Sequence, residues 1–171
     1  MTFRTICAAL AAAGLAPATA YAEPAATPID AQSHYSGVWL EVGRTPMAIT
    51  KGCVAGTTTY SLKDSTQVAV VDDCREGGVT GKRKAISGRG LIEDPGVNRR
   101  LKVTYAAFIT WRYEVLERDP QGGWFISADP GLKKIFLYTR KPPSEALLAH
   151  LVSRARALGY NGEIETPAPL P

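Results

Sequence analysis

Hydrophobic and polar residues alternate along residues 37–45, and this pattern predicts a β-strand. Successive side chains of a strand point to opposite faces, so Trp39 and Glu41 share one face while Leu40 and Val42 share the other. Both faces are partly apolar. We therefore expect both to be covered, one by the interior of a barrel and the other by a helix.

Seven further segments of the same type follow, and turn sequences such as Asp94-Pro95-Gly96 separate them. No helical pattern lies between these segments, which favours an antiparallel meander. Such a sheet hides its edges by closing into a barrel, and eight strands leave an interior for side chains and one small ligand. The seven predicted strands cover residues 53–62, 66–75, 79–93, 99–107, 110–118, 123–128 and 133–140.

The periodicity becomes helical after the last strand. Apolar residues form one stripe along residues 143–158, where Ser144 can cap the start and Gly159 can end the helix. The predicted fold class is therefore all-β, an eight-stranded antiparallel up-and-down barrel with one C-terminal α-helix packed on its outer wall. The residues expected to seat the helix are Val38, Leu40, Val42, Ile135 and Leu137.

The N-terminal residues 1–22 have the features of a secretory signal peptide. Arg4 precedes an apolar run, and small residues lead up to a cleavage site after Ala22. The run is too short to span a membrane, which takes roughly 20 residues. We therefore expect a periplasmic or secreted protein. The remaining chain divides into a flexible linker at 23–34, a main domain at 35–166 with one short strand near 163–166, and a disordered tail at 167–171.

The residue inventory gives little support for catalysis. The two histidines, His34 and His150, belong to no metal-binding motif, and no serine nucleophile elbow or phosphate-binding loop is present. Glu41 and Glu114 could act as a carboxylate pair, but exposed or ion-paired roles explain them as well. We expect no enzyme, no metal and no cofactor. The balance of 20 Lys and Arg against 16 Asp and Glu is mild and does not call for nucleic acid.

Two of the three cysteines, Cys53 and Cys74, lie beyond the predicted signal peptide. An even pair in an oxidising compartment favours a disulfide over a free reactive thiol. If Lys63 and Asp64 form the loop between the second and third strands, Cys53 lies directly opposite Cys74. Opposed Cβ atoms are then about 4.5–5.5 Å apart, which is close to what a disulfide needs.

With these segments in place, the sequence resembles the lipocalin family, and it is most similar to the bacterial lipocalins and their relatives of the apolipoprotein D type. The resemblance covers about residues 35–166. Leu40 stands where a tyrosine is common, and Cys7 lies too early for a lipid-anchoring signal. The motifs that carry the resemblance are Gly37–Arg44, Lys51–Val54, Thr59–Leu62, Cys74-Arg75, Asp94–Val103, Tyr113–Leu116, Asp119-Pro120 and Leu137–Arg140, with a helix after the last.

The resemblance implies a barrel closed at one end by Trp39, with Arg140 packed across its ring as a structural pair. A guanidinium group over an indole contributes roughly 0.5–2 kcal/mol. The open end would hold an apolar ligand. Nearby basic residues could meet its head group, but a solvated face explains them better. These basic residues are Lys82, Arg83, Lys84, Arg99 and Arg100. The side chains expected to bind the ligand are Tyr60, Val103, Tyr105, Trp111, Tyr113 and Phe136.

We therefore expect a binding or transport protein for a small hydrophobic ligand, either a fatty acid or a lysophospholipid. Two alternatives stay open: an enzyme that acts on a lipophilic substrate inside the barrel, and a carrier of a tetrapyrrole or another pigment. Peripheral contact with a membrane, association with an outer membrane and a homodimer are also left open by the sequence.

Overall fold

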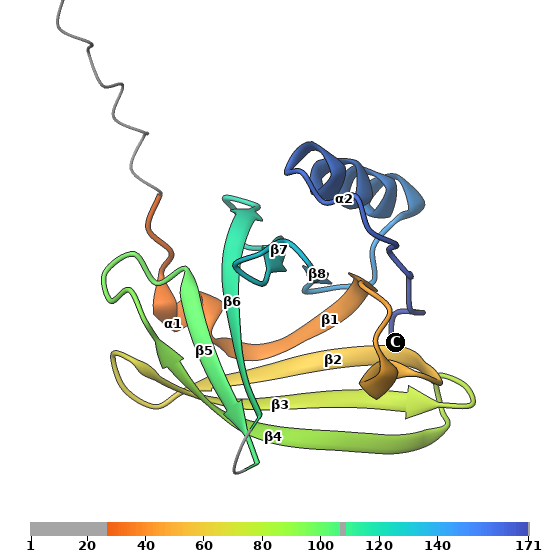
Figure 1. The fold of residues 1–171 in the computed structure, drawn as a ribbon, viewed down its shortest axis with the longest axis horizontal. Coiled ribbons are helices and arrows are strands. Elements are labelled where there is room, and N and C mark those ends of the chain that lie inside the picture. Colours follow the sequence, from red (N-terminus) through yellow and green to blue (C-terminus); the bar gives the residue numbers. More distant parts are fainter. Residues whose placement is uncertain (1–26, 107–108, 171) are drawn as a thin grey trace, which may run out of the picture.

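The computed structural model describes residues 27–106 and 109–170, so the predicted signal peptide and its cleavage site at Ala22 lie outside the described residues. The chain forms a closed barrel of eight antiparallel strands in sequence order, as predicted (Figure 1). Its strands are β1 (Ser36–Arg44), β2 (Cys53–Leu62), β3 (Gln67–Glu76), β4 (Lys82–Ile92), β5 (Arg100–Tyr105), β6 (Ile109–Arg118), β7 (Trp124–Ala128) and β8 (Ile135–Thr139). Its helical segments are α1 (Ala31–His34), η1 (Ala48–Thr50) and α2 (Glu145–Ala157).

The α2 helix packs on the outer wall of the barrel. Ser144 caps its first turn by accepting a hydrogen bond from the backbone N–H of Leu147. Leu151 and Ala155 on the helix form an apolar cluster with the outward side chains of β1 and β8, which are Leu40, Val42, Ile135 and Leu137. We expected Val38 to contact α2 as well, but its side chain is 49 % exposed. The helix packs instead against Leu40 and Val42, further along β1.

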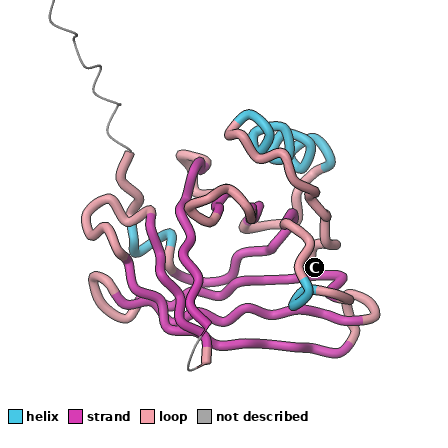
Figure 2. The backbone as a smooth tube through the Cα atoms, viewed as in Figure 1, coloured by secondary structure: helices cyan, strands magenta, loops and turns pink. Residues whose placement is uncertain are grey.

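A second apolar cluster lies inside the barrel and extends from Ile29, Tyr35 and Trp39 near α1 to cavity-lining residues such as Tyr105 and Phe136. The α1 and η1 segments lie at opposite ends of the barrel (Figure 2). Residues 27–34, the described part of the predicted linker, lie at the α1 end and contact the barrel through Ile29. Asp30 caps α1, and Ile29 is 1 % exposed and lies in the interior cluster. The backbone N–H of Ile29 donates to the carbonyl of Val97, so this segment is tied to the loop that precedes β5.

The turn between β2 and β3 differs from the prediction. The carboxylate of Asp64 accepts the backbone N–H groups of Thr66 and Gln67. The backbone N–H of Lys63 donates to the carbonyl of Gln67, so the loop covers residues 64–66 rather than Lys63 and Asp64. Every pairing between the two strands is shifted as a result.

The predicted disulfide between Cys53 and Cys74 is present. The predicted strand register around it is wrong, because the two cysteines do not lie directly opposite each other. Cys74 faces Gly56 across the pair of strands, and Cys53 faces Glu76. A β-bulge between Cys53 and Ala55 displaces the start of β2, which brings the two cysteine Cα atoms to 5.5 Å and allows the bridge to form.

The segment after α2 returns across the ends of β1 and β2. Arg44 and Glu165 form an isolated antiparallel bridge where a short strand was expected. Further on, the backbone N–H of Ala168 donates to the carbonyl of Val54, and Leu170 packs against the outer cluster. In the described residues, no helix is long and apolar enough to cross a membrane.

Candidate functional site

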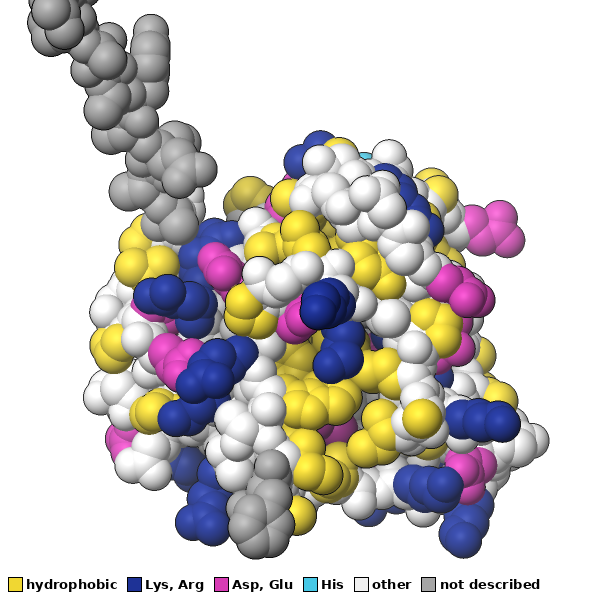
Figure 3. Space-filling model, viewed as in Figure 1, with side chains coloured by type: hydrophobic (Ala, Val, Ile, Leu, Met, Phe, Trp, Pro, Cys, Tyr) yellow, Lys and Arg dark blue, Asp and Glu magenta, His cyan; other side chains and the backbone are white. Residues whose placement is uncertain are grey.

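The barrel encloses a cavity of about 420 Å³. Ligand sites commonly measure about 300–1,000 Å³. The cavity lies towards the η1 end, because Met47, Ile49 and Thr50 line it, whereas Trp39 and Tyr60 near α1 belong to the interior cluster but not to the lining. In the space-filling view, apolar side chains gather in the recess at the centre of one face, below α2, with basic side chains around them (Figure 3).

Four of the six predicted ligand contacts line this cavity: Tyr105 from β5, Trp111 and Tyr113 from β6, and Phe136 from β8. Their alternation along the strands turns them inward. Tyr60 and Val103 were also expected there, but both are buried in the interior cluster outside the cavity lining. The reason is that the α1 end of the barrel is solidly packed with aromatic rings, and Tyr60 stacks edge-on against Tyr35 at this end.

The closed end contains the predicted contact between Arg140 and Trp39. The guanidinium carbon lies 3.5 Å from the centroid of the indole ring. Arg140 also donates hydrogen bonds to the backbone carbonyls of Ser33, Ser36 and Val38, and the indole N–H donates to the carbonyl of His34 at 3.0 Å. These contacts join α1, β1 and the end of β8.

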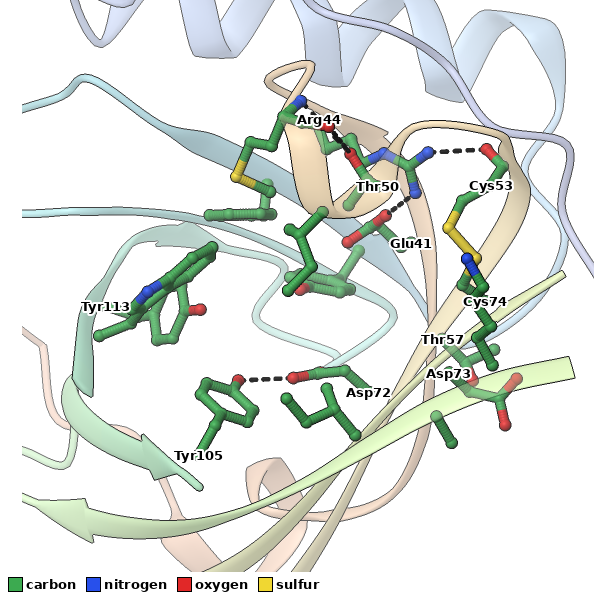
Figure 4. A pocket seen from close by; sticks show the side chains of 18 of the residues that line it. Glu41, Arg44, Thr50, Cys53, Thr57, Asp72, Asp73, Cys74, Tyr105 and Tyr113 are labelled. Atoms are coloured by element: carbon green, nitrogen blue, oxygen red, sulfur yellow. Dashed lines mark hydrogen bonds and ion pairs between the residues drawn. A yellow bond between two sulfur atoms is a disulfide. The ribbon is translucent and has the colours of Figure 1, made fainter. Parts of the chain in front are cut away.

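Sequence reasoning missed Asp72, a carboxylate on β3 that lines the cavity (Figure 4). The hydroxyl of Tyr105 donates to its Oδ2 at 2.5 Å, and the hydroxyl of Thr58 donates to its Oδ1 at 2.6 Å. Burial raises the pKa of Asp72, and these two hydrogen bonds oppose the rise. One signal could have revealed it: Val68 and Val70 are buried in the interior, so the alternation of β3 places Asp72 on the same face.

Arg44 forms an ion-paired group in the cavity wall. Only 1 % of the residue is exposed, and its guanidinium donates to Glu41 at 2.5 Å, to Glu165 and to the carbonyl of Cys53 at 2.8 Å. Burial raises the pKa of Glu41 to about 7, although Arg44 opposes the rise. The structure thus pairs Glu41 with Arg44, in place of the carboxylate pair with Glu114 that the sequence had left open.

The two histidines lie away from the cavity lining. His34 is buried at the closed end, where burial and the charges of Arg118 and Arg140 lower its pKa to about 3. His150 lies on α2, against the ring of Trp124. In the described part of the chain, no group of three or more His, Cys, Asp or Glu side chains is placed to hold a metal ion.

Comparison with known proteins agrees with this architecture. Residues 29–169 match a family model described as a lipocalin-like domain. A search of curated proteins finds no sequence that matches the chain.

Several solved structures share the fold at low sequence identity. Lobster apocrustacyanin A1 is 14 % identical, with a TM-score of 0.59 over 81 % of this chain and 79 % of its own. Insecticyanin from the tobacco hornworm Manduca sexta is 14 % identical, with a TM-score of 0.59 over 77 % and 74 %. The cockroach allergen Per a 4 is 14 % identical, with a TM-score of 0.59 over 86 % and 93 %. At this identity the likeness concerns the fold alone.

Proposed function

The chain belongs to the lipocalin family, and from this premise we propose that it is a binding protein that holds a small hydrophobic ligand inside its barrel. The observation that carries the proposal is the cavity of about 420 Å³ with its largely aromatic and aliphatic wall. The aliphatic part of that wall comes from Met47, Ile49, Ile86 and Ile109. Transfer of a ligand methylene group from water to such a wall stabilises the complex by roughly 0.8 kcal/mol.

We propose a fatty acid or a lysophospholipid as the ligand. A single acyl chain suits a cavity of this size, and the polar side chains of the lining could contact its head group. We also propose that the protein works in the periplasm or outside the cell. The disulfide between Cys53 and Cys74 supports this location, because such bridges persist in oxidising compartments.

Tryptophan fluorescence tests the site directly, because the three tryptophans lie in different surroundings. Trp111 lines the cavity, Trp39 is buried at the closed end, and Trp124 packs in the outer cluster. Titration with lauric acid or lauroyl lysophosphatidylcholine should change the emission of the wild-type protein. Trp111→Phe should remove most of this change, whereas the matched control Trp124→Phe should keep it.

Two results would contradict the proposal. One is a calorimetric titration in which neither lipid binds; the other is a fluorescence response that survives in Trp111→Phe and disappears in Trp124→Phe. Mass spectrometry of an organic extract of the purified protein identifies the natural ligand. A visible absorption band in that preparation would indicate a pigment carrier, and turnover of a lipophilic ester would indicate an enzyme.

A further inference from the structure

Asp72 differs in its ion pairing from the other carboxylates of the described cavity lining. Among the described residues, Asp72 takes part in no ion pair. The other two carboxylates in the lining are paired, since Glu41 contacts Arg44 and Asp73 contacts Arg83. Asp72 is therefore the carboxylate of the described cavity lining that lacks a cationic partner.

The cations of the cavity lining are already engaged elsewhere. Arg44 lies between Glu41 and Glu165, and Lys84 pairs with Glu76. Neither forms an ion pair with Asp72, whose charge is stabilised by two hydroxyl groups alone. A carboxylate has about four acceptor positions, so two hydroxyl donors leave Asp72 able to accept further hydrogen bonds from a ligand.

The aromatic rings around this carboxylate also suit a cation. Tyr105 and Trp111 lie with ring centroids 6.4 Å apart, and Trp111 and Tyr113 with centroids 6.1 Å apart. Cations are attracted to the faces of such rings within about 6 Å of the centroid. Trp111 already makes one contact of this kind, because the Nζ atom of Lys134 lies 4.4 Å from its centroid.

We propose that the cavity selects a hydrophobic ligand that carries an ammonium group over one that carries a carboxylate, with Asp72 as the residue that determines this specificity. The ammonium group would donate to Asp72 and lie against the rings of Tyr105 and Tyr113. A ligand carboxylate in the same place would be repelled by Asp72, and the two cations of the described cavity lining, Arg44 and Lys84, are already ion-paired. The proposal rests on the proposed function, and within it favours an amine-bearing lipid over a fatty acid.

Three ligands of equal chain length test the proposal: decylammonium, decanol and decanoate, titrated calorimetrically at pH 7.5. We expect the wild-type protein to bind decylammonium at least about tenfold more tightly than decanoate, as removal of a buried charge pair commonly costs this much or more. Asp72→Asn should bring the two affinities to within about threefold of each other, while the affinity for decanol should change by less than about threefold.

Glu93→Gln is the matched control. Glu93 follows β4, lies outside the cavity lining and is paired with Arg112, so this variant should keep the preference for decylammonium. Binding of decanol without a preference for the amine would overturn the inference and leave the proposed function intact. Failure of all three ligands to bind would overturn both. The ranking of the ligands on the wild-type protein decides the question even if Asp72→Asn does not fold.

Discussion

Replacement of Arg140 with alanine tests whether the closed end of the barrel stabilises the fold. The guanidinium group lies over Trp39 and donates to three backbone carbonyls at 2.7–3.0 Å. A hydrogen bond with a charged partner contributes about 1.5–3 kcal/mol, and a cation–π contact about 0.5–2 kcal/mol. Arg140 is only partly buried, so water can replace some of these contacts. We expect a net loss of about 3 kcal/mol in the free energy of unfolding.

In a domain of this size, a loss of about 3 kcal/mol lowers the melting temperature by about 6–12 °C. Circular dichroism during heating measures this shift. Arg112 offers a matched control because it is exposed and pairs with Glu93, so Arg112→Ala should lower the melting temperature by less than about 4 °C. Arg140→Ala should still bind decanol, since the cavity lies towards the other end. An unchanged melting temperature in Arg140→Ala would refute the structural role assigned to this residue.

Two further predictions concern the disulfide and the buried histidine. Replacement of both Cys53 and Cys74 with serine should lower the free energy of unfolding by about 3 kcal/mol, because the bridge closes a loop of 21 residues in the unfolded chain. An unchanged midpoint of urea unfolding would contradict this. The pKa of His34 falls from 6.5 to about 3 on folding, so only the unfolded state gains its proton between these values. The wild-type protein should therefore lose about 1.4 kcal/mol per pH unit relative to His34→Gln on acidification below about pH 6.5. If the free energies of unfolding of the two proteins changed with pH in parallel, protonation of His34 would not be linked to folding. The raised pKa of Glu41 has the opposite effect on stability, but it is present in both proteins and therefore cancels in the comparison.

The sequence predicted the strands well because alternation is a local property. All eight strands and α2 lie within a few residues of their predicted bounds, and the inward direction of Tyr105, Trp111 and Phe136 follows from the same alternation. The predicted register between β2 and β3 was wrong because a side-chain contact determines the length of the loop between them. The Asp64 carboxylate binds two backbone N–H groups and thereby selects a different loop.

The contact between Arg44 and Glu41 in the cavity wall could not be predicted because it depends on irregular geometry. A bulge between Glu41 and Gly43 interrupts the alternation of β1 and lets Arg44 reach Glu41. Gly43 is needed at this bulge, since a Cβ atom there would lie 2.5 Å from a methyl carbon of Leu137. Asp72 follows the regular alternation of β3, which places it on the inward face, but its hydrogen bonds to Thr58 and Tyr105 join three strands and have no local signal in the sequence.

The connectivity of the barrel sets the order in which it can be completed during folding. Each strand pairs with its neighbour in sequence, and among the strands only the pairing of β1 with β8 joins distant segments. The hairpin of β2 and β3 can therefore form early, while the second edge of β1 has no partner until β8 reaches it. The folding chain presents an open sheet edge throughout this time, and such edges pair readily with other chains. Docking of α2 must come last, because its seat needs β1 and β8 side by side.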